Sequence, residues 1–148
     1  MTRSSDPKRK VLFLCTSNSC RSQMAEALVN AELFDSWSAF SAGSKPAKAV
    51  HPLALRVLAE QGISHQGWPK SINEFRKQSF DLIFTVCEDK SEDCPIWLGA
   101  GKQIHLAFPD PALATGSEDE KFAVFQKVRD DMQKRIFSIL NSLEKKEN

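Results

Sequence analysis

Two apolar runs, within residues 11–14 and 81–86, stand out along the chain. Runs of this kind are typical of strands buried on both faces, as in a parallel sheet. Each run is followed at once by a cysteine, Cys15 or Cys87. Because the carboxyl ends of parallel strands lie at one edge, where open α/β sheets bind ligands, we expect these two thiols to be neighbours.

The spacing of the other apolar positions predicts the remaining elements. Strands are predicted over residues 37–41 and 104–108, and helices over residues 19–34, 52–61 and 72–78, with a last helix ending near residue 143. Ser117 and Glu120 have the spacing of a capping box, which marks the start of that last helix. Alternating strands and helices predict a single α/β domain over residues 10–144, with a flexible leader at 1–9 and a solvated tail at 145–148.

Composition narrows the class of protein. Of 148 residues, 41% are hydrophobic and 26% are charged, and the net charge of +1 gives no field that favours nucleic acid or a membrane surface. No apolar stretch approaches the ~20 residues that span a bilayer, and the amino-terminal segment lacks a secretory signal. We therefore expect a cytoplasmic protein, in which four cysteines indicate redox chemistry or metal binding rather than structural disulfides.

The segment after the first strand has the composition of an anion-binding loop. It runs Cys15, Thr16, Ser17, Asn18, Ser19, Cys20, Arg21, Ser22. A loop between a buried strand and a helix can turn its backbone N–H groups toward one tetrahedral oxyanion, and Arg21 adds a planar fork for two of the anion's oxygens. The same field favours the thiolate of Cys15, with Ser22 as a donor to the sulfur and Asn18 holding the loop shape. We interpret Cys15 as a nucleophile that faces its own anion site.

An acid is expected at the same edge of the sheet. Asp110 follows the last predicted strand and lies between Pro109 and Pro111, which restrict the backbone and so direct the carboxyl group. A protonated Asp110 can donate to a leaving oxygen. Without Cys15, a simple Asp-Pro turn would be the better interpretation.

Together these residues resemble the low-molecular-weight protein tyrosine phosphatase family, and more closely its arsenate reductase branch, the three-cysteine type recycled by thioredoxin. The resemblance extends over residues 10–143. It is carried by residues 13–26, 41–43, 87–94, 110–112 and 121–130. It implies a three-layer α/β fold with a four-stranded parallel sheet, strand order 2-1-3-4, and helices on both faces.

The resemblance also implies a reaction. Cys15 attacks arsenate held by the loop and Arg21, and Asp110 protonates the departing hydroxide. Cys87 then attacks the sulfur of Cys15 and arsenite leaves. Cys94 attacks Cys87, and the resulting disulfide is reduced by an external dithiol, thioredoxin or a glutaredoxin-type protein. A monomer is expected, with no tightly bound cofactor and no nucleic-acid or membrane partner.

Relatives of this type bind a potassium ion beside the loop. The matching positions are Asn18, Glu26 and Ser41. The fourth ligand, an aspartate, falls near Ser71, which carries no charge. We therefore expect at most a weak potassium site.

Other functions are open. A phosphatase for phosphotyrosine or small phosphate esters would use the same loop and Asp110 but would need neither Cys87 nor Cys94. Phosphatases commonly carry an aromatic residue at the position of Ala112, which favours arsenate here. A redox sensor or anion-binding regulator would keep the thiols and need no acid.

Cys87 and Cys94 have alternative readings too, as inert buried thiols or as zinc ligands with His105. Six residues intervene between the two cysteines, whereas paired zinc ligands are usually separated by about two to four. A regular helix over 87–94 would place them ~10.5 Å apart along its axis, beyond the ~7 Å between Cα atoms that a disulfide allows. We hypothesise that residues 88–94 switch from helix to loop on oxidation.

The remaining thiol and two histidines are assigned no chemistry. Cys20 is expected to be a passive loop residue, with a protective disulfide to Cys15 as the alternative. His51 and His65 are expected to be surface residues.

Overall fold

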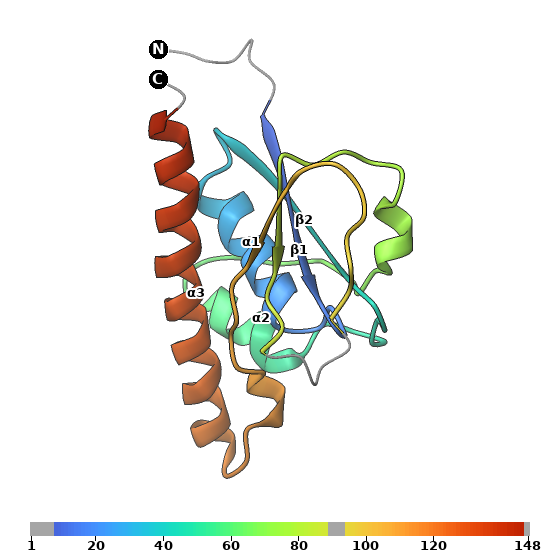
Figure 1. Ribbon diagram of the computed structural model, residues 1–148. Helices are drawn as coiled ribbons and strands as arrows, with labels where there is room; N and C mark the ends of the chain where they lie inside the picture. Colours follow the sequence, from blue (N-terminus) through green and yellow to red (C-terminus); the bar gives the residue numbers. More distant parts are fainter. Residues whose placement is uncertain (1–7, 89–93, 147–148) are drawn as a thin grey trace.

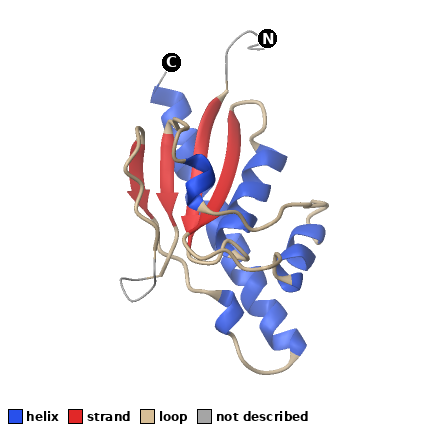
Figure 2. Ribbon diagram, turned by 90° about the vertical axis from the view of Figure 1, so that its right-hand side faces the viewer, coloured by secondary structure: helices blue, strands red, loops and turns tan. Residues whose placement is uncertain are grey.

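A four-stranded parallel sheet organises the chain. The computed structural model describes residues 8–88 and 94–146. The strands are β1 (Arg9–Cys15), β2 (Trp37–Gly43), β3 (Leu82–Thr85) and β4 (Lys102–His105). Their order is β2-β1-β3-β4, and all four arrows point the same way in Figure 2. The implied order 2-1-3-4 is therefore confirmed.

Helices cover both faces of this sheet. The α-helices of the described part are α1 (Arg21–Glu32), α2 (Pro52–Ala59) and α3 (Glu118–Lys146), and they pack together on one face. The 3₁₀ helix η1 (Ile72–Phe75) and Trp97 cover the other face. Figure 1 shows α1–α3 to the left of the sheet and η1 to the right. A second 3₁₀ helix, η2 (Pro111–Leu113), leads toward α3.

Alternation along β1 sends its side chains into two separate cores. Val11, Phe13 and Cys15 face the α-helices, and the ring of Phe13 stacks on that of Phe84 with centroids 5.3 Å apart. Leu12 and Leu14 face η1 instead. The apolar run is continuous because both faces are covered. This alternation puts Cys15 on the α-helix side of the sheet.

The predicted strand over 104–108 is wrong at both ends, because β4 spans Lys102–His105. The prediction relied on apolar residues and therefore omitted Lys102 and Gln103. These residues are polar because β4 is an edge strand that is largely exposed. Gly101, at φ +120°, turns the chain into the strand. After Leu106, which still bonds to Thr85, the chain leaves the sheet.

Other boundaries differ by a few residues. The short helix expected at 72–78 is the single 3₁₀ turn η1, and α1 begins at Arg21 because residues 16–20 form the connection between β1 and α1. The segment 1–9 expected as a leader already contributes Arg9 to β1, and residues 1–7 lie outside the described part. At the other end, α3 extends to Lys146, beyond the predicted end.

No helix in the described ranges is long and apolar enough to cross a bilayer.

Candidate active site

Cys15 ends β1 with its sulfur turned into the following loop. We call residues 15–22 the anion loop. The backbone N–H of Asn18 lies 3.3 Å from the sulfur, and the hydroxyl of Ser22 lies 2.8 Å from it. The predicted contact between Ser22 and the thiol is therefore confirmed. Both groups contact a sulfur that is almost fully buried.

Asn18 holds the shape of the anion loop through its amide side chain. Its backbone has φ +54°, the left-handed region that asparagine tolerates better than most residues. Its Nδ2 donates to Ser22 at 2.7 Å, while its Oδ1 accepts from the backbone N–H of Lys70 at 2.8 Å and from Gln23 at 3.0 Å. The predicted role of Asn18 in fixing the loop is confirmed, and its partners include a segment remote in sequence.

The end of β2 must be small for the loop to pack against it. A Cβ atom at Gly43 would lie 2.5 Å from the carbonyl oxygen of Thr16 and 3.0 Å from the backbone nitrogen of Asn18. Such contacts would displace the loop backbone itself. This close approach accounts for the glycine that ends the segment 41–43.

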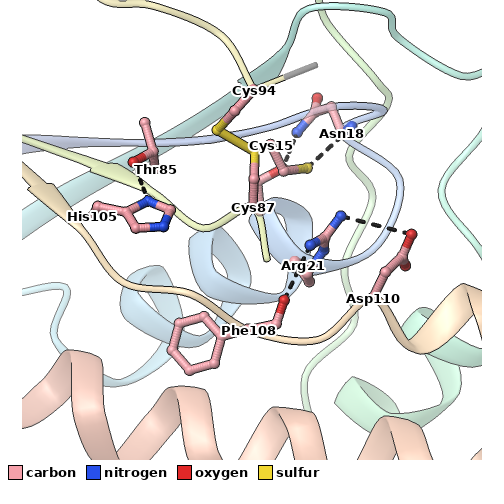
Figure 3. The surroundings of a disulfide bond; sticks show 10 residues. Cys15, Asn18, Arg21, Thr85, Cys87, Cys94, His105, Phe108 and Asp110 are labelled. Atoms are coloured by element: carbon pink, nitrogen blue, oxygen red, sulfur yellow. Dashed lines mark hydrogen bonds and ion pairs between the residues drawn. A yellow bond between two sulfur atoms is a disulfide. The ribbon is translucent and has the colours of Figure 1, made fainter. Parts of the chain in front are cut away.

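Arg21 and Asp110 lie far apart in the sequence but are neighbours in the fold (Figure 3). Arg21 is 3% exposed, and its Nη1 donates to the carbonyl oxygen of Phe108 at 3.1 Å. Its Nη2 lies 3.7 Å from Oδ2 of Asp110, whose Oδ1 accepts from the backbone N–H of Ala112 at 3.0 Å. The Asp-Pro turn therefore both orients the acid and sets it beside the arginine.

The second and third cysteines lie at the same edge. A hydrogen bond of 2.9 Å from the N–H of Val86 to the carbonyl of Leu14 continues the β1–β3 ladder, so Cys15 and Cys87 follow neighbouring strands in one core. Cys87 is joined to Cys94 by a disulfide, with Cα atoms 5.9 Å apart, and Figure 3 shows this bond beside Cys15. The expected neighbourhood of the two thiols is confirmed.

The disulfide overturns the two alternative readings of Cys87 and Cys94. Bonded sulfurs are neither inert thiols nor zinc ligands, and His105 instead bonds to Thr85 at 2.8 Å. No cluster of His, Cys, Asp and Glu in the described ranges could hold a metal ion. The hypothesis of a helix-to-loop switch falls on residues 89–93, outside the described part, and stays a prediction.

Cys20 is a free thiol in an environment unlike that of Cys15. Burial raises the pKa of Cys20 to about 12 and outweighs the hydrogen bond from Ser19, which lowers it. The negative charges of Asp110 and Cys15 raise the pKa further, and the positive charge of Arg21 lowers it slightly. At neutral pH this side chain is a protonated thiol and a poor nucleophile. These findings support the passive role expected for it.

His51 and His65, which we expected to be surface residues, are both partly exposed, but each has a partner in the fold. Nδ1 of His51 accepts from the N–H of Leu53 and so caps α2. Nε2 of His65 lies 2.6 Å from Oε1 of Gln23, and desolvation lowers the pKa of this half-buried imidazole. Gln23 and Lys70, which hold Asn18, were also missed. Gln23 lies in the motif of residues 13–26, but its role and that of Lys70 emerge only from contacts with distant segments.

The expected potassium ligands are already bonded to protein groups. The hydroxyl of Ser41 donates to Oε1 of Glu26 at 2.5 Å, and the ammonium group of Lys70 lies 3.9 Å from the same oxygen. Oδ1 of Asn18 accepts two N–H groups, and the hydroxyl of Ser71 accepts from Asn73 to cap η1. A site that already holds an ammonium group does not fit a second monovalent cation.

The parallel sheet and the cysteine–arginine loop at its carboxyl edge define the class of low-molecular-weight tyrosine phosphatase-like proteins. Residues 10–148 match the family described as low molecular weight phosphotyrosine protein phosphatase, and the chain belongs to this family.

Similar proteins within the family include arsenate reductases. That of Bacillus licheniformis is 41% identical over 130 residues, which cover 87% of this chain and 93% of the relative. The crystal structure of the arsenate reductase from Archaeoglobus fulgidus has 34% identity and a TM-score of 0.68, covering 85% of this chain and 98% of that one. A thioredoxin-dependent arsenate reductase of Corynebacterium glutamicum has 30% identity and a TM-score of 0.68, covering 95% and 64%.

Proposed function

We propose that this protein is an arsenate reductase, which converts arsenate to arsenite and is recycled by an external dithiol. One observation carries the proposal: a free thiol in an anion loop lies beside a disulfide formed by two further cysteines, Cys87 and Cys94. Hydrolysis of phosphate esters needs the loop but neither of those cysteines. The relatives named as arsenate reductases support the same reaction.

The first step forms a bond between sulfur and arsenic. The thiolate of Cys15 attacks arsenate held by the backbone N–H groups of the anion loop and by Arg21. One oxygen of arsenate leaves as hydroxide and takes a proton from Asp110, so that water departs. The position of Asp110 beside the buried Arg21 fits a group that acts on an oxygen of the same anion.

The next steps transfer two electrons to arsenic. Cys87 attacks the sulfur of Cys15, and the electron pair of the S–As bond stays with arsenic, which passes from the pentavalent to the trivalent state and leaves as arsenite. Cys94 then attacks the sulfur of Cys87, and Cys15 returns to its thiolate form. The product is a Cys87–Cys94 disulfide with Cys15 free, the arrangement described above.

An external dithiol completes the cycle by reducing this disulfide and becoming a disulfide itself. Cys87 is 0% exposed, whereas Cys94 is only partly buried, so the reductant's thiolate reaches Cys94. The Corynebacterium glutamicum relative is described as thioredoxin-dependent, which supports a thioredoxin-type partner. We infer that the protein works in the cytoplasm, where such dithiols are kept reduced, and that it acts as a monomer.

Phosphatase activity is a second, weaker candidate. The anion loop and Asp110 suit a phosphate ester as well as arsenate, since both are tetrahedral oxyanions. Ala112, which follows Asp110-Pro111, provides no aromatic ring for a phosphotyrosine side chain. We therefore expect slow hydrolysis of small phosphate esters beside arsenate reduction.

Cys94→Ser separates the two activities. In arsenate-dependent NADPH oxidation with thioredoxin and its reductase, this variant should show no repeated turnover. It should reduce one arsenate and stop, because no third thiol is present to attack the Cys15–Cys87 disulfide. It should still hydrolyse para-nitrophenyl phosphate at the wild-type rate, whereas Cys15→Ser should lose both activities. Normal repeated turnover by Cys94→Ser would refute the relay, and a parallel assay with glutaredoxin identifies the reductant.

A further inference from the structure

We propose that the ammonium group of Lys70 is a built-in cation that holds the anion loop in place, and that the enzyme consequently needs no monovalent metal ion. Lys70 is then a positioning residue for the reaction at Cys15. The proposal rests on the proposed function only where catalysis is the readout. It starts from the finding that the residues expected to bind potassium are bonded to groups of the protein instead.

Glu26 supplies the negative charge that needs a partner. Its side chain is 17% exposed on α1 and accepts a hydrogen bond from the hydroxyl of the fully buried Ser41 of β2. The ammonium of Lys70 lies 3.9 Å from Oε1 of Glu26, and the side chain of Lys70 is 13% exposed. A carboxylate removed this far from water is costly without a nearby positive charge. Lys70 provides that charge from within the chain.

Further contacts keep the ammonium at this position. Nζ of Lys70 donates to the carbonyl oxygen of Trp68 at 2.8 Å and lies 5.5 Å from the centre of the Trp68 ring. The same carbonyl accepts from Nε2 of Gln23 at 3.0 Å. A carboxylate, a carbonyl and an aromatic face are the partners that a cation selects.

The backbone of Lys70 connects this cation to the nucleophile. Its N–H donates to Oδ1 of Asn18 at 2.8 Å, and its carbonyl accepts from the N–H of Gly43 at 2.8 Å. Asn18 in turn contacts the sulfur of Cys15 and the hydroxyl of Ser22. The contact of the ammonium group with Glu26 also fixes the position of the Lys70 backbone. This backbone supports Asn18 in its left-handed conformation. Loss of the ammonium therefore loosens the loop without removing any atom that contacts substrate.

Four variants separate charge from volume at this position. Lys70→Ala removes the ammonium and opens space for an ion, Lys70→Met fills the space without charge, and Lys70→Arg retains the charge. Lys127→Ala, at an exposed position of α3, is the matched control for the loss of a lysine. Each is compared in about 0.1 M potassium, sodium or choline chloride, a concentration that keeps general screening equal.

The melting temperature is measured first because it does not depend on the reaction. For wild type, Lys70→Arg and Lys127→Ala, the melting temperature of each protein should differ by no more than about 1 °C among the three salts. Lys70→Ala should melt several degrees lower in choline chloride and recover most of the loss in potassium chloride. Lys70→Met should melt lower in all salts. The double variant Glu26→Gln/Lys70→Ala should lose the response to potassium, because the charge that attracts the ion is gone.

Kinetics should follow the same order. In choline chloride we expect kcat/KM of Lys70→Ala for arsenate to fall about tenfold, with potassium restoring it and sodium restoring less. A potassium response in the wild type would overturn the proposal, as would wild-type stability of Lys70→Ala in choline chloride. A Lys70→Ala defect that no salt corrects would reduce Lys70 to a packing role and equally refute it. If the wild type failed to reduce arsenate, the melting data would still decide the role of Lys70.

Discussion

At the scale of single residues, the anion loop places two cysteines in opposite chemical environments. Cys15 receives a backbone N–H and a hydroxyl at its sulfur, whereas Cys20 is buried, and its pKa is raised to about 12. A thiol that stays protonated at neutral pH is a poor nucleophile, which sets Cys20 apart although the two residues share a loop. The largest cause of the raised pKa of Cys20 is its burial, which the residue types of the loop do not reveal by themselves.

Cys20→Ala should therefore leave catalysis almost intact. We expect kcat/KM for arsenate within about twofold of wild type in the thioredoxin-coupled assay, since a thiol that titrates near pH 12 is not the attacking group. Mass spectrometry after iodoacetamide treatment at neutral pH, on protein whose disulfide is intact, should find the label on Cys15 and not on Cys20. A loss of repeated turnover in Cys20→Ala would show that Cys20 takes part in the relay.

At the scale of elements, the start of α3 depends on a local hydrogen-bond exchange. The N–H of Ser117 donates to Oε1 of Glu120 at 2.8 Å, and the N–H of Glu120 donates to the hydroxyl of Ser117 at 3.1 Å. The capping box expected from the sequence is confirmed. The bonds from the backbone and the side chain of Ser117 lower the pKa of Glu120 below its ordinary value of 4.5.

Glu120→Ala should destabilise the protein in a pH-dependent way. Because the pKa of Glu120 is lower in the folded state, its contribution is present above the ordinary pKa of 4.5 and is lost as the pH falls through the folded value. At neutral pH we expect a melting temperature roughly 2–4 °C below wild type. Thermal scans from pH 7 downward should show this gap closing in acid. Asp119→Ala, in the same first turn, is the control, and an equal pH-dependent gap there would assign the effect to the helix dipole.

At the scale of the whole molecule, Arg129 connects α3 to α2, the helix that begins beside the anion loop. This buried arginine donates to the carbonyl oxygen of Val57 at 2.9 Å and pairs with Glu60 and Asp130. It thus joins α3 to α2. The first residue before α2, His51, donates its N–H to the carbonyl of Ser19 in the anion loop at 2.9 Å. The longest helix is in this way linked to the anion loop through α2.

Arg129→Ala should lower stability more than activity. It leaves the carbonyl of Val57 without its donor and removes bonds to two carboxylates, so we expect the melting temperature to fall by about 5 °C or more. The kcat/KM for arsenate, measured well below the transition, should stay within about twofold of wild type because Arg129 contacts no residue of the loop. Lys134→Ala, exposed on the same helix, should change neither value. A large activity loss in stable Arg129→Ala would show that the α2–α3 link positions the loop.

Local signals in the sequence were sufficient to predict the existence of most elements and to select candidate residues for the site. Continuous apolar runs before Cys15 and Cys87, the Ser117–Glu120 box and the prolines around Asp110 each reflect interactions over a few neighbouring residues. The limits of β4 were missed because an edge strand carries polar, exposed residues and has no apolar run to reveal it.

Only the tertiary structure decided which distant groups meet. The pairing of Arg21 with Asp110, the support of Asn18 by Lys70 and the position of the Lys70 ammonium beside Glu26 depend on how separate segments of the chain pack. A sequence pattern records what a residue does with its neighbours along the chain, through backbone geometry and burial. The partner of a buried charge is set by three-dimensional packing, which brings groups from separate segments within a few ångströms.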